Sequence, residues 1–140
     1  YFTATSRLSS TIIEAQTKNV QEKNAQSIEA MHSLKEQARL MKEALLRGRV
    51  DEIGAILDYG FRYKKQMASG ISNDRLDGIY EAALSAGATG GKISGAGGGG
   101  FMMFYCPGST RHAVRTALEQ FGGTFRAYDF VEHGLVTWTV

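Results

Sequence analysis

The feature that most constrains this chain is a dense run of glycines in its second half. Of its 17 glycines, eight lie between Gly87 and Gly100, and residues 95–100 read Gly-Ala-Gly-Gly-Gly-Gly. Glycine loses more backbone entropy on folding than any other residue, so such a run needs a structural reason. One reason is a set of positive φ angles that turn successive N–H groups toward an anion. A second is close approach of a ligand without Cβ atoms in the way.

A flexible hairpin connection is the simpler alternative for this segment. Such a connection needs only about two to five loop residues and one or two glycines. The run from Gly95 to Gly100 is richer in glycine than that. We therefore favour a phosphate-binding loop.

Three common phosphate-loop motifs do not fit the surrounding sequence. Gly95, Gly97 and Gly100 match G-x-G-x-x-G, but the dinucleotide motif opens a helix, whereas residues 101–106 read as a strand. The P-loop requires Lys and then Ser or Thr after its last glycine, where this chain has Phe101. The downstream sequence also lacks the H-R-D and D-F-G triplets of the eukaryotic protein kinases.

The residues before the loop favour an anion as well. In a strand, Lys92 and Ser94 point to one side and Ile93 to the other. A cation and a hydroxyl would then flank the mouth of the loop, an arrangement that suits phosphate. A solvated lysine beside a loop is the alternative.

Apolar periodicity predicts an α+β fold. A ferredoxin-like antiparallel sheet is expected to carry helices on one face, with additional long helices. Helices are expected from about residue 11, around residues 31–45, over about 51–68, from Asn73 to about Gly87 and over about 109–121. Strands are expected at 1–5, 92–94, 101–106, 124–131 and 135–140.

The clearest helical pattern is an apolar stripe with spacings of three and four residues. Such a stripe is typical of a helix face that packs on a core. It consists of Met31, Leu34, Ala38, Met41 and Leu45. Further along, the basic cluster Arg62, Lys64 and Lys65 is interpreted as a solvated helix face.

Composition excludes several classes of protein. With 43% hydrophobic residues and a net charge of +2, the 140 residues can bury a core and are not disordered. No run approaches the ~18 apolar residues of a membrane span. No basic stripe with interleaved aromatics indicates nucleic-acid binding. The single cysteine, Cys106, points to a reducing compartment, most simply the cytoplasm.

Two segments of the chain resemble the GHMP small-molecule kinases. Residues 91–101, Gly-Lys-Ile-Ser-Gly-Ala-Gly-Gly-Gly-Gly-Phe, resemble the third conserved motif of that family. Residues 1–10 resemble the opening of the C-terminal half in the branch acting on D-glycero-D-manno-heptose 7-phosphate, with the fucokinase kinase domain as a near neighbour. Ala4 departs from that branch, which has glycine there.

The resemblance implies a kinase that transfers the γ-phosphoryl group of ATP to a sugar hydroxyl with Mg²⁺. The main nucleotide loop and the catalytic Asp and Lys would belong to an N-terminal domain outside this chain. The residues expected to contact phosphate or nucleotide are Lys92, Ser94, Gly95, Ala96, Gly97, Gly98, Gly99 and Gly100. Thr5 and Arg7 are expected at the substrate, although Arg7 could instead pair with a carboxylate on a neighbouring helix.

The chain begins at Tyr1, inside a strand-like run. We therefore expect residues 1–140 to form a single C-terminal domain of a longer protein, inactive in isolation. The partners expected are ATP, a sugar phosphate and the N-terminal domain. Two other classes of function stay open: a ferredoxin-like module that binds an anion without catalysis, and a helix-rich interaction domain that uses the stripe at residues 31–45.

Overall fold

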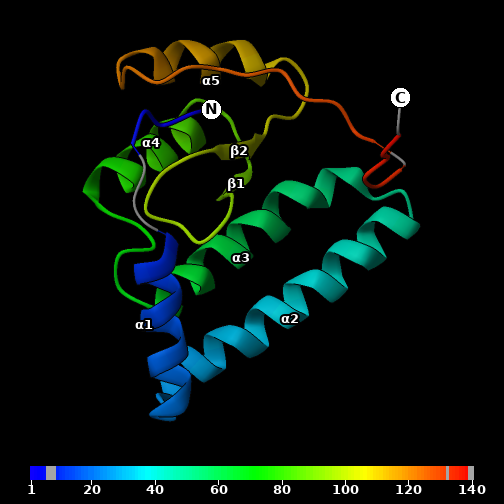
Figure 1. The fold of residues 1–140 in the computed structure, drawn as a ribbon. Coiled ribbons are helices and arrows are strands. Elements are labelled where there is room, and N and C mark those ends of the chain that lie inside the picture. The colour runs from blue at the N-terminus through cyan, green and yellow to red at the C-terminus, as the bar shows by residue number, and fades with distance from the viewer. Residues whose placement is uncertain (6–8, 132, 139–140) are drawn as a thin grey trace.

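The computed structural model describes residues 1–5, 9–131 and 133–138 and has the predicted α+β architecture (Figure 1). Five α-helices, a 3₁₀ turn and two strands make up its regular elements in these ranges. The helices are α1 (Ser9–Gln21), α2 (Ala25–Leu46), α3 (Ile53–Met67), α4 (Asp74–Ser85) and α5 (Thr110–Glu119), and the turn η1 is Val50–Glu52. The strands are β1 (Gly90–Ile93) and β2 (Met102–Tyr105).

Four segments build the antiparallel sheet: a hairpin of two strands, the first residues of the chain and the single residue Thr124. Strands β1 and β2 pair from Gly90 opposite Tyr105 to Ile93 opposite Met102. On the other side of β2, Tyr1 and Met102 exchange backbone hydrogen bonds, each with an N···O distance of 2.8 Å. The first residues also pair outward, because Phe2 and Thr124 exchange backbone bonds of 2.7 and 3.0 Å. The order in space is therefore β1, β2, residues 1–3 and residue 124.

The two strands predicted near the C-terminus, residues 124–131 and 135–140, are wrong: only Thr124 pairs with another segment among the described residues. Apart from the bridge at Thr124, the described residues 125–131 and 133–138 form no strand. Phe125 packs against Tyr1 at the edge of the core, but the large apolar side chains from Tyr128 onward face solvent, with Phe130 and Leu135 exposed to 92% and 93%. Alternating polarity permits a strand, but a strand also needs a neighbouring backbone to pair with, and no described segment pairs with this one. The remaining predicted strand residues, 132 and 139–140, lie outside the described residues.

The predicted first strand is shorter than expected. Pairing involves Phe2 and its two neighbours, and Ala4 then adopts a φ of +57°, which turns the chain away from the extended direction. A non-glycine residue rarely adopts this left-handed conformation. The family resemblance predicts glycine at this position. The positive φ angle of Ala4 explains that preference, because glycine adopts it without strain.

The main core lies where the sheet meets α3, α4 and α5. Buried side chains come from each of these elements, and Leu76, Ile79, Ile93 and Leu118 have no exposed surface. Helix α4 begins where the sequence predicted, because the Asn73 side chain accepts a hydrogen bond of 3.1 Å from the Leu76 N–H.

Helix α2 lies along α3, outside this core (Figure 1). Its buried residues are small: Ser27, Ala30, Ser33 and Ala44. The predicted apolar stripe is rotated away from this face, since Met31 and Leu45 are 43% and 56% exposed. The close approach of the two helices explains the difference, because small residues allow backbones to come near. Gly60 of α3 reflects the same proximity, since a Cβ there would overlap the Gln37 side chain of α2.

No helix in the described parts of the chain combines the length and apolar character that crossing a bilayer requires.

Candidate phosphate-binding site

The glycine-rich loop connects β1 to β2 and has the backbone that the sequence predicted. All five of its glycines adopt positive φ angles that side chains rarely tolerate. The values are +76° for Gly95, +117° for Gly97, +75° for Gly98, +147° for Gly99 and +86° for Gly100. Glycine is therefore required here by conformation.

Close approach is a second requirement, and the approaching groups belong to this chain. A Cβ on Gly97 would lie 2.8 Å from the Ile71 carbonyl oxygen, and the next residue, Gly98, donates to that oxygen at 2.8 Å. A Cβ on Gly99 would lie 2.8 Å from the Thr5 carbonyl carbon. The inner side of the loop is thus packed against the segments before α4 and α1.

The outer side of the loop is open. A Cβ built on Gly95 or Gly100 would meet no atom within 4 Å. The N–H groups of Gly95, Ala96, Gly97 and Gly99 donate to no acceptor among the described residues. Of these four residues, Gly97 and Gly99 are buried, Ala96 is half-buried and Gly95 is exposed. Backbone N–H groups are strong donors that nearly always find a partner when they are shielded from water. The N–H groups of Gly95 and Ala96 are therefore the ones available to a ligand.

Thr5 lies beside the loop and supports it. Its carbonyl accepts a hydrogen bond of 2.7 Å from the Gly100 N–H, and its hydroxyl lies 3.0 Å from the Thr3 hydroxyl. The buried Thr3 in turn donates to the Gly100 carbonyl at 3.0 Å. Thr5 is thus next to the residues predicted to bind phosphate, and its role at the substrate stays a prediction. Arg7, the other predicted substrate residue, lies outside the described residues.

Lys92 and Ser94 flank the loop as the strand alternation predicted. Ile93 is completely buried, whereas Lys92 is half-buried and Ser94 is exposed. The Ser94 N–H closes the base of the loop by donating to the Phe101 carbonyl at 2.8 Å. Side chains of both residues therefore remain on the open side.

Sequence reasoning missed one residue of this site, Lys64 of α3. Its ammonium donates a hydrogen bond to the Gly95 carbonyl. Burial lowers the pKa of Lys64, and the nearby positive charge of Lys92 lowers this pKa further. The structure thus brings two lysines from different elements to the same loop.

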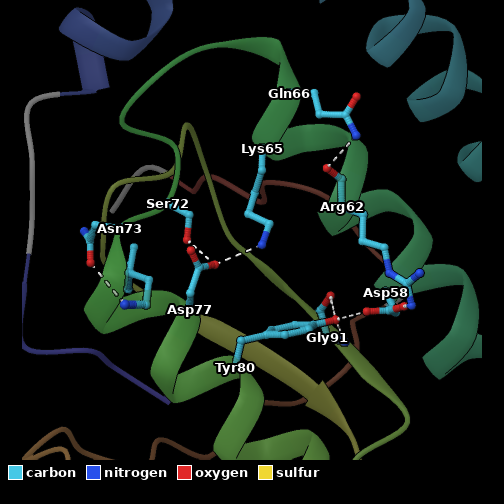
Figure 2. A network of polar contacts seen from close by, with 10 residues as sticks. Asp58, Arg62, Lys65, Gln66, Ser72, Asn73, Asp77, Tyr80 and Gly91 are labelled. Atoms are coloured by element: carbon cyan, nitrogen blue, oxygen red, sulfur yellow. Dashed lines mark hydrogen bonds and ion pairs between the residues drawn. The ribbon is translucent and has the colours of Figure 1, made fainter.

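The basic cluster of α3 does not form one uniform solvated face. Arg62 pairs with Asp58, and the Lys65 ammonium lies 3.0 Å from a carboxylate oxygen of Asp77 (Figure 2). Successive residues of a helix point about 100° apart, so neighbours in sequence meet different surroundings. Only the position of α3 against β1 shows that Lys64 faces the loop.

A buried polar network fixes β1 at the base of this site (Figure 2). The Tyr80 hydroxyl of α4 donates to Asp58 of α3 at 2.9 Å and accepts from the Gly91 N–H of β1 at 3.1 Å. Burial raises the pKa of Tyr80, and the hydrogen bond to Asp58 raises it further. The phenol therefore stays neutral and joins three elements below the loop.

The described residues contain no group of three or more His, Cys, Asp or Glu side chains placed to hold a metal ion. Cys106 is half-buried, and burial raises the pKa of its thiol. A raised pKa keeps the thiol protonated and unreactive. The chemical resources of this site are therefore backbone N–H donors, two ammonium groups and a hydroxyl, which together suit a phosphoryl anion.

Fold and loop thus define a class of α+β domains in which a glycine-rich loop joins two antiparallel strands. Comparison with known families makes the class specific. Residues 41–124, more than half of the chain, match the family model "GHMP kinases C terminal". The chain belongs to the GHMP kinase C-terminal domain family, as its motif indicated.

Individual relatives give the same assignment. The chain is 39% identical over 114 residues to "D-glycero-alpha-D-manno-heptose 7-phosphate kinase" of Campylobacter jejuni, a match covering 81% of this chain and 34% of the relative. It is 47% identical over 57 residues to "Mevalonate kinase" of Pyrococcus abyssi, covering 41% and 17%. It is 29% identical over 120 residues to "Bifunctional fucokinase/GDP-fucose pyrophosphorylase" of Arabidopsis thaliana, covering 85% and 11%.

A solved structure shows the same fold. L. major mevalonate kinase, crystallised with R-mevalonate, superposes with a TM-score of 0.77 at 22% identity. The match covers 85% of this chain and 36% of that protein. The matched region spans about a third of the length of the heptose kinase and of this structure.

Proposed function

We propose that this chain is the C-terminal half of an ATP-dependent sugar kinase. The observation that carries the proposal is the 39% identity to the heptose 7-phosphate kinase over 114 of the 140 residues. A match of 114 residues within a 140-residue chain starts no later than residue 27 and ends no earlier than residue 114. It therefore includes the glycine loop, Lys64 and Lys92. An N-terminal domain would supply the main nucleotide loop and the catalytic Asp and Lys.

In the proposed reaction, a sugar hydroxyl oxygen bonds to the γ-phosphorus of ATP. The bond from that phosphorus to the β,γ-bridging oxygen breaks, and the hydroxyl proton passes to a base of the N-terminal domain. Phosphoryl transfer depends mainly on positioning and on charge stabilisation. The N–H groups of the glycine loop, Ser94 and Lys92 would hold phosphate oxygens in place. Mg²⁺, bound with the phosphates, would neutralise developing charge.

The proposed substrate is D-glycero-D-manno-heptose 7-phosphate, phosphorylated at its anomeric hydroxyl. Support comes from coverage, because the heptose kinase match spans 81% of the chain and the Pyrococcus abyssi match spans 41%. Thr5 and Arg7 are assigned to the substrate. A fucokinase-type activity is the second candidate, favoured by a match over 85% of the chain at 29% identity.

The test is ADP release by the full-length protein with Mg²⁺ and ATP. Heptose 7-phosphate, fucose and mevalonate are offered separately, and ³¹P NMR identifies the product. We expect the highest kcat/KM with heptose 7-phosphate and a new anomeric phosphate. Faster turnover of fucose than of heptose 7-phosphate would instead support the fucokinase-type activity. No turnover of any acceptor would favour an anion-binding module without catalysis.

The 140-residue chain alone should release no more ADP than a protein-free control, because the proposed base and main nucleotide loop lie elsewhere. The single cysteine suits a reducing compartment, and we assign the protein to the cytoplasm. Localisation of a tagged full-length protein tests this assignment.

A further inference from the structure

Two lysines, Lys64 and Lys92, converge on the glycine loop, and no described carboxylate pairs with either of them. The Lys64 ammonium of α3 donates to the Gly95 carbonyl, and α3 packs against β1, which carries Lys92. Neither lysine forms an ion pair within the described residues. Two like charges held together repel, unless an anion lies between them.

The neighbours of Lys64 on the same helix show the contrast. Arg62 and Lys65 each have a carboxylate within ion-pair distance, Asp58 and Asp77 respectively (Figure 2). Lys64 is half-buried, and among the described residues its ammonium has one polar contact, to the neutral Gly95 carbonyl. Withdrawing a charge from water without a counter-charge is costly. The arrangement is therefore suited to a ligand that brings the counter-charge.

The open side of the loop supplies the remaining contacts. The N–H groups of the exposed Gly95 and the half-buried Ala96 lack acceptors among the described residues, and no atom lies within 4 Å of a Cβ built on Gly95. A lysine ammonium has three donors, so the bond to the Gly95 carbonyl leaves two for a ligand. A phosphoryl group offers three acceptor oxygens and a charge of about −1.5 to −2.

We infer that Lys64, together with Lys92, binds the phosphoryl group of a reactant on the open side of the glycine loop. Lys64 is thus an additional binding residue of the proposed kinase, and the inference rests on that proposed function. Either the nucleotide or the sugar phosphate can supply such a group. The chemistry is the same, and the kinetics of each reactant distinguish the sources.

The first experiment measures KM for ATP and for heptose 7-phosphate in the full-length protein. The variants are Lys64→Met, Lys64→Arg and the matched control Lys65→Met, which removes the same charge one residue further along α3. Loss of a charge-assisted hydrogen bond should raise KM for one reactant about tenfold or more in Lys64→Met. The control should change KM by less than about twofold, as expected for an exposed ion pair. Lys64→Arg should recover most of the loss.

The second experiment needs no turnover. The full-length protein is treated with an amine-acylating reagent with and without inorganic tripolyphosphate, and acylated lysines are quantified by mass spectrometry. Tripolyphosphate should protect Lys64 about fivefold or more, which corresponds to an anion site that is mostly occupied. Lys18, exposed on α1, should not be protected.

Equal KM values in Lys64→Met and Lys65→Met, or equal protection of Lys64 and Lys18, would each overturn the inference. Failure of the proposed function has a different signature. If Lys64 is protected but no acceptor is turned over, the loop binds an anion and the proposed kinase function is wrong. If an acceptor is turned over but Lys64 is not protected, the kinase function stands and the inferred role of Lys64 is wrong.

Discussion

Substituting alanine at Gly97 and at Gly95 separates the two reasons for glycine in the loop. Both residues have positive φ angles, +117° and +76°. Only Gly97 is also packed, since its Cβ would lie 2.8 Å from the Ile71 carbonyl oxygen and 2.9 Å from the Ile71 Cα. The Cβ of alanine at position 95 would meet no atom within 4 Å. The pair therefore isolates backbone contact from backbone conformation.

The contacts at each position decide which energies contribute to the loss of stability. At Gly95, the left-handed conformation costs alanine about 1–2 kcal/mol, and reduced freedom of the unfolded chain offsets about 0.4–1 kcal/mol. At Gly97, conformational strain of about 1–3 kcal/mol is joined by about 1–3 kcal/mol for displacing the Ile71 backbone. The same unfolded-chain offset applies at both positions, so we expect Gly97→Ala to lose about 1–5.5 kcal/mol and Gly95→Ala about 0–1.5 kcal/mol.

Urea denaturation of the purified chain, followed by far-UV circular dichroism, measures both values. The slope of the unfolding free energy against urea should match that of the parent, so that midpoints can be compared. The midpoint for Gly97→Ala should be clearly the lower. If the two variants lose the same free energy to within about 0.5 kcal/mol, packing against Ile71 does not constrain the loop.

Three further substitutions test other parts of the structure. Ala4→Gly should raise the unfolding free energy by about 0.5–1 kcal/mol, because it relieves a left-handed alanine; a loss of stability in urea denaturation would contradict the observed φ of +57°. Tyr80→Phe should lower it by about 1–3 kcal/mol in the same assay, since Asp58 and the Gly91 N–H lose a partner; an unchanged midpoint would mean that the network contributes nothing. In the full-length protein, Gly98→Val should reduce kcat/KM for ATP on the order of 100-fold, while strain of about 1–3 kcal/mol leaves it folded in a thermal melt. An unchanged kcat/KM in a folded variant would refute the role of the loop in holding phosphate.

Local signals in the sequence predicted much of the site. The cap at Asn73, the outward Lys92 and Ser94, and the positive φ angles of the loop all follow from short-range chemistry. Lys64 could not be found in this way. Its role depends on how α3 packs against β1, and no spacing within residues 62–65 distinguishes the lysine at the loop from its paired neighbours.

The two errors in the fold have one physical origin. An apolar pattern in the sequence shows which face of a helix or strand could be buried. The neighbouring elements in the fold decide which face is buried. On α2, small residues such as Ala30 and Ala44 form the contact face, and Met31 and Leu45 stay partly exposed. Residues 125–131 alternate as strands do, yet only Thr124 has a backbone to pair with in the described chain.

The placement of the first residues in the middle of the sheet has a consequence for how the chain folds. Tyr1 bonds to Met102 on one side, and its hydroxyl accepts from the Gly123 N–H, 122 positions away, at 2.8 Å. Contacts between such distant residues close a large loop, and topologies that depend on them fold slowly. During synthesis, the first residues leave the ribosome long before residues 102 and 123 do. The sheet can therefore be completed only after residue 124 has emerged, and until residues 100–102 have emerged residues 1–3 lack both of their neighbours in the sheet.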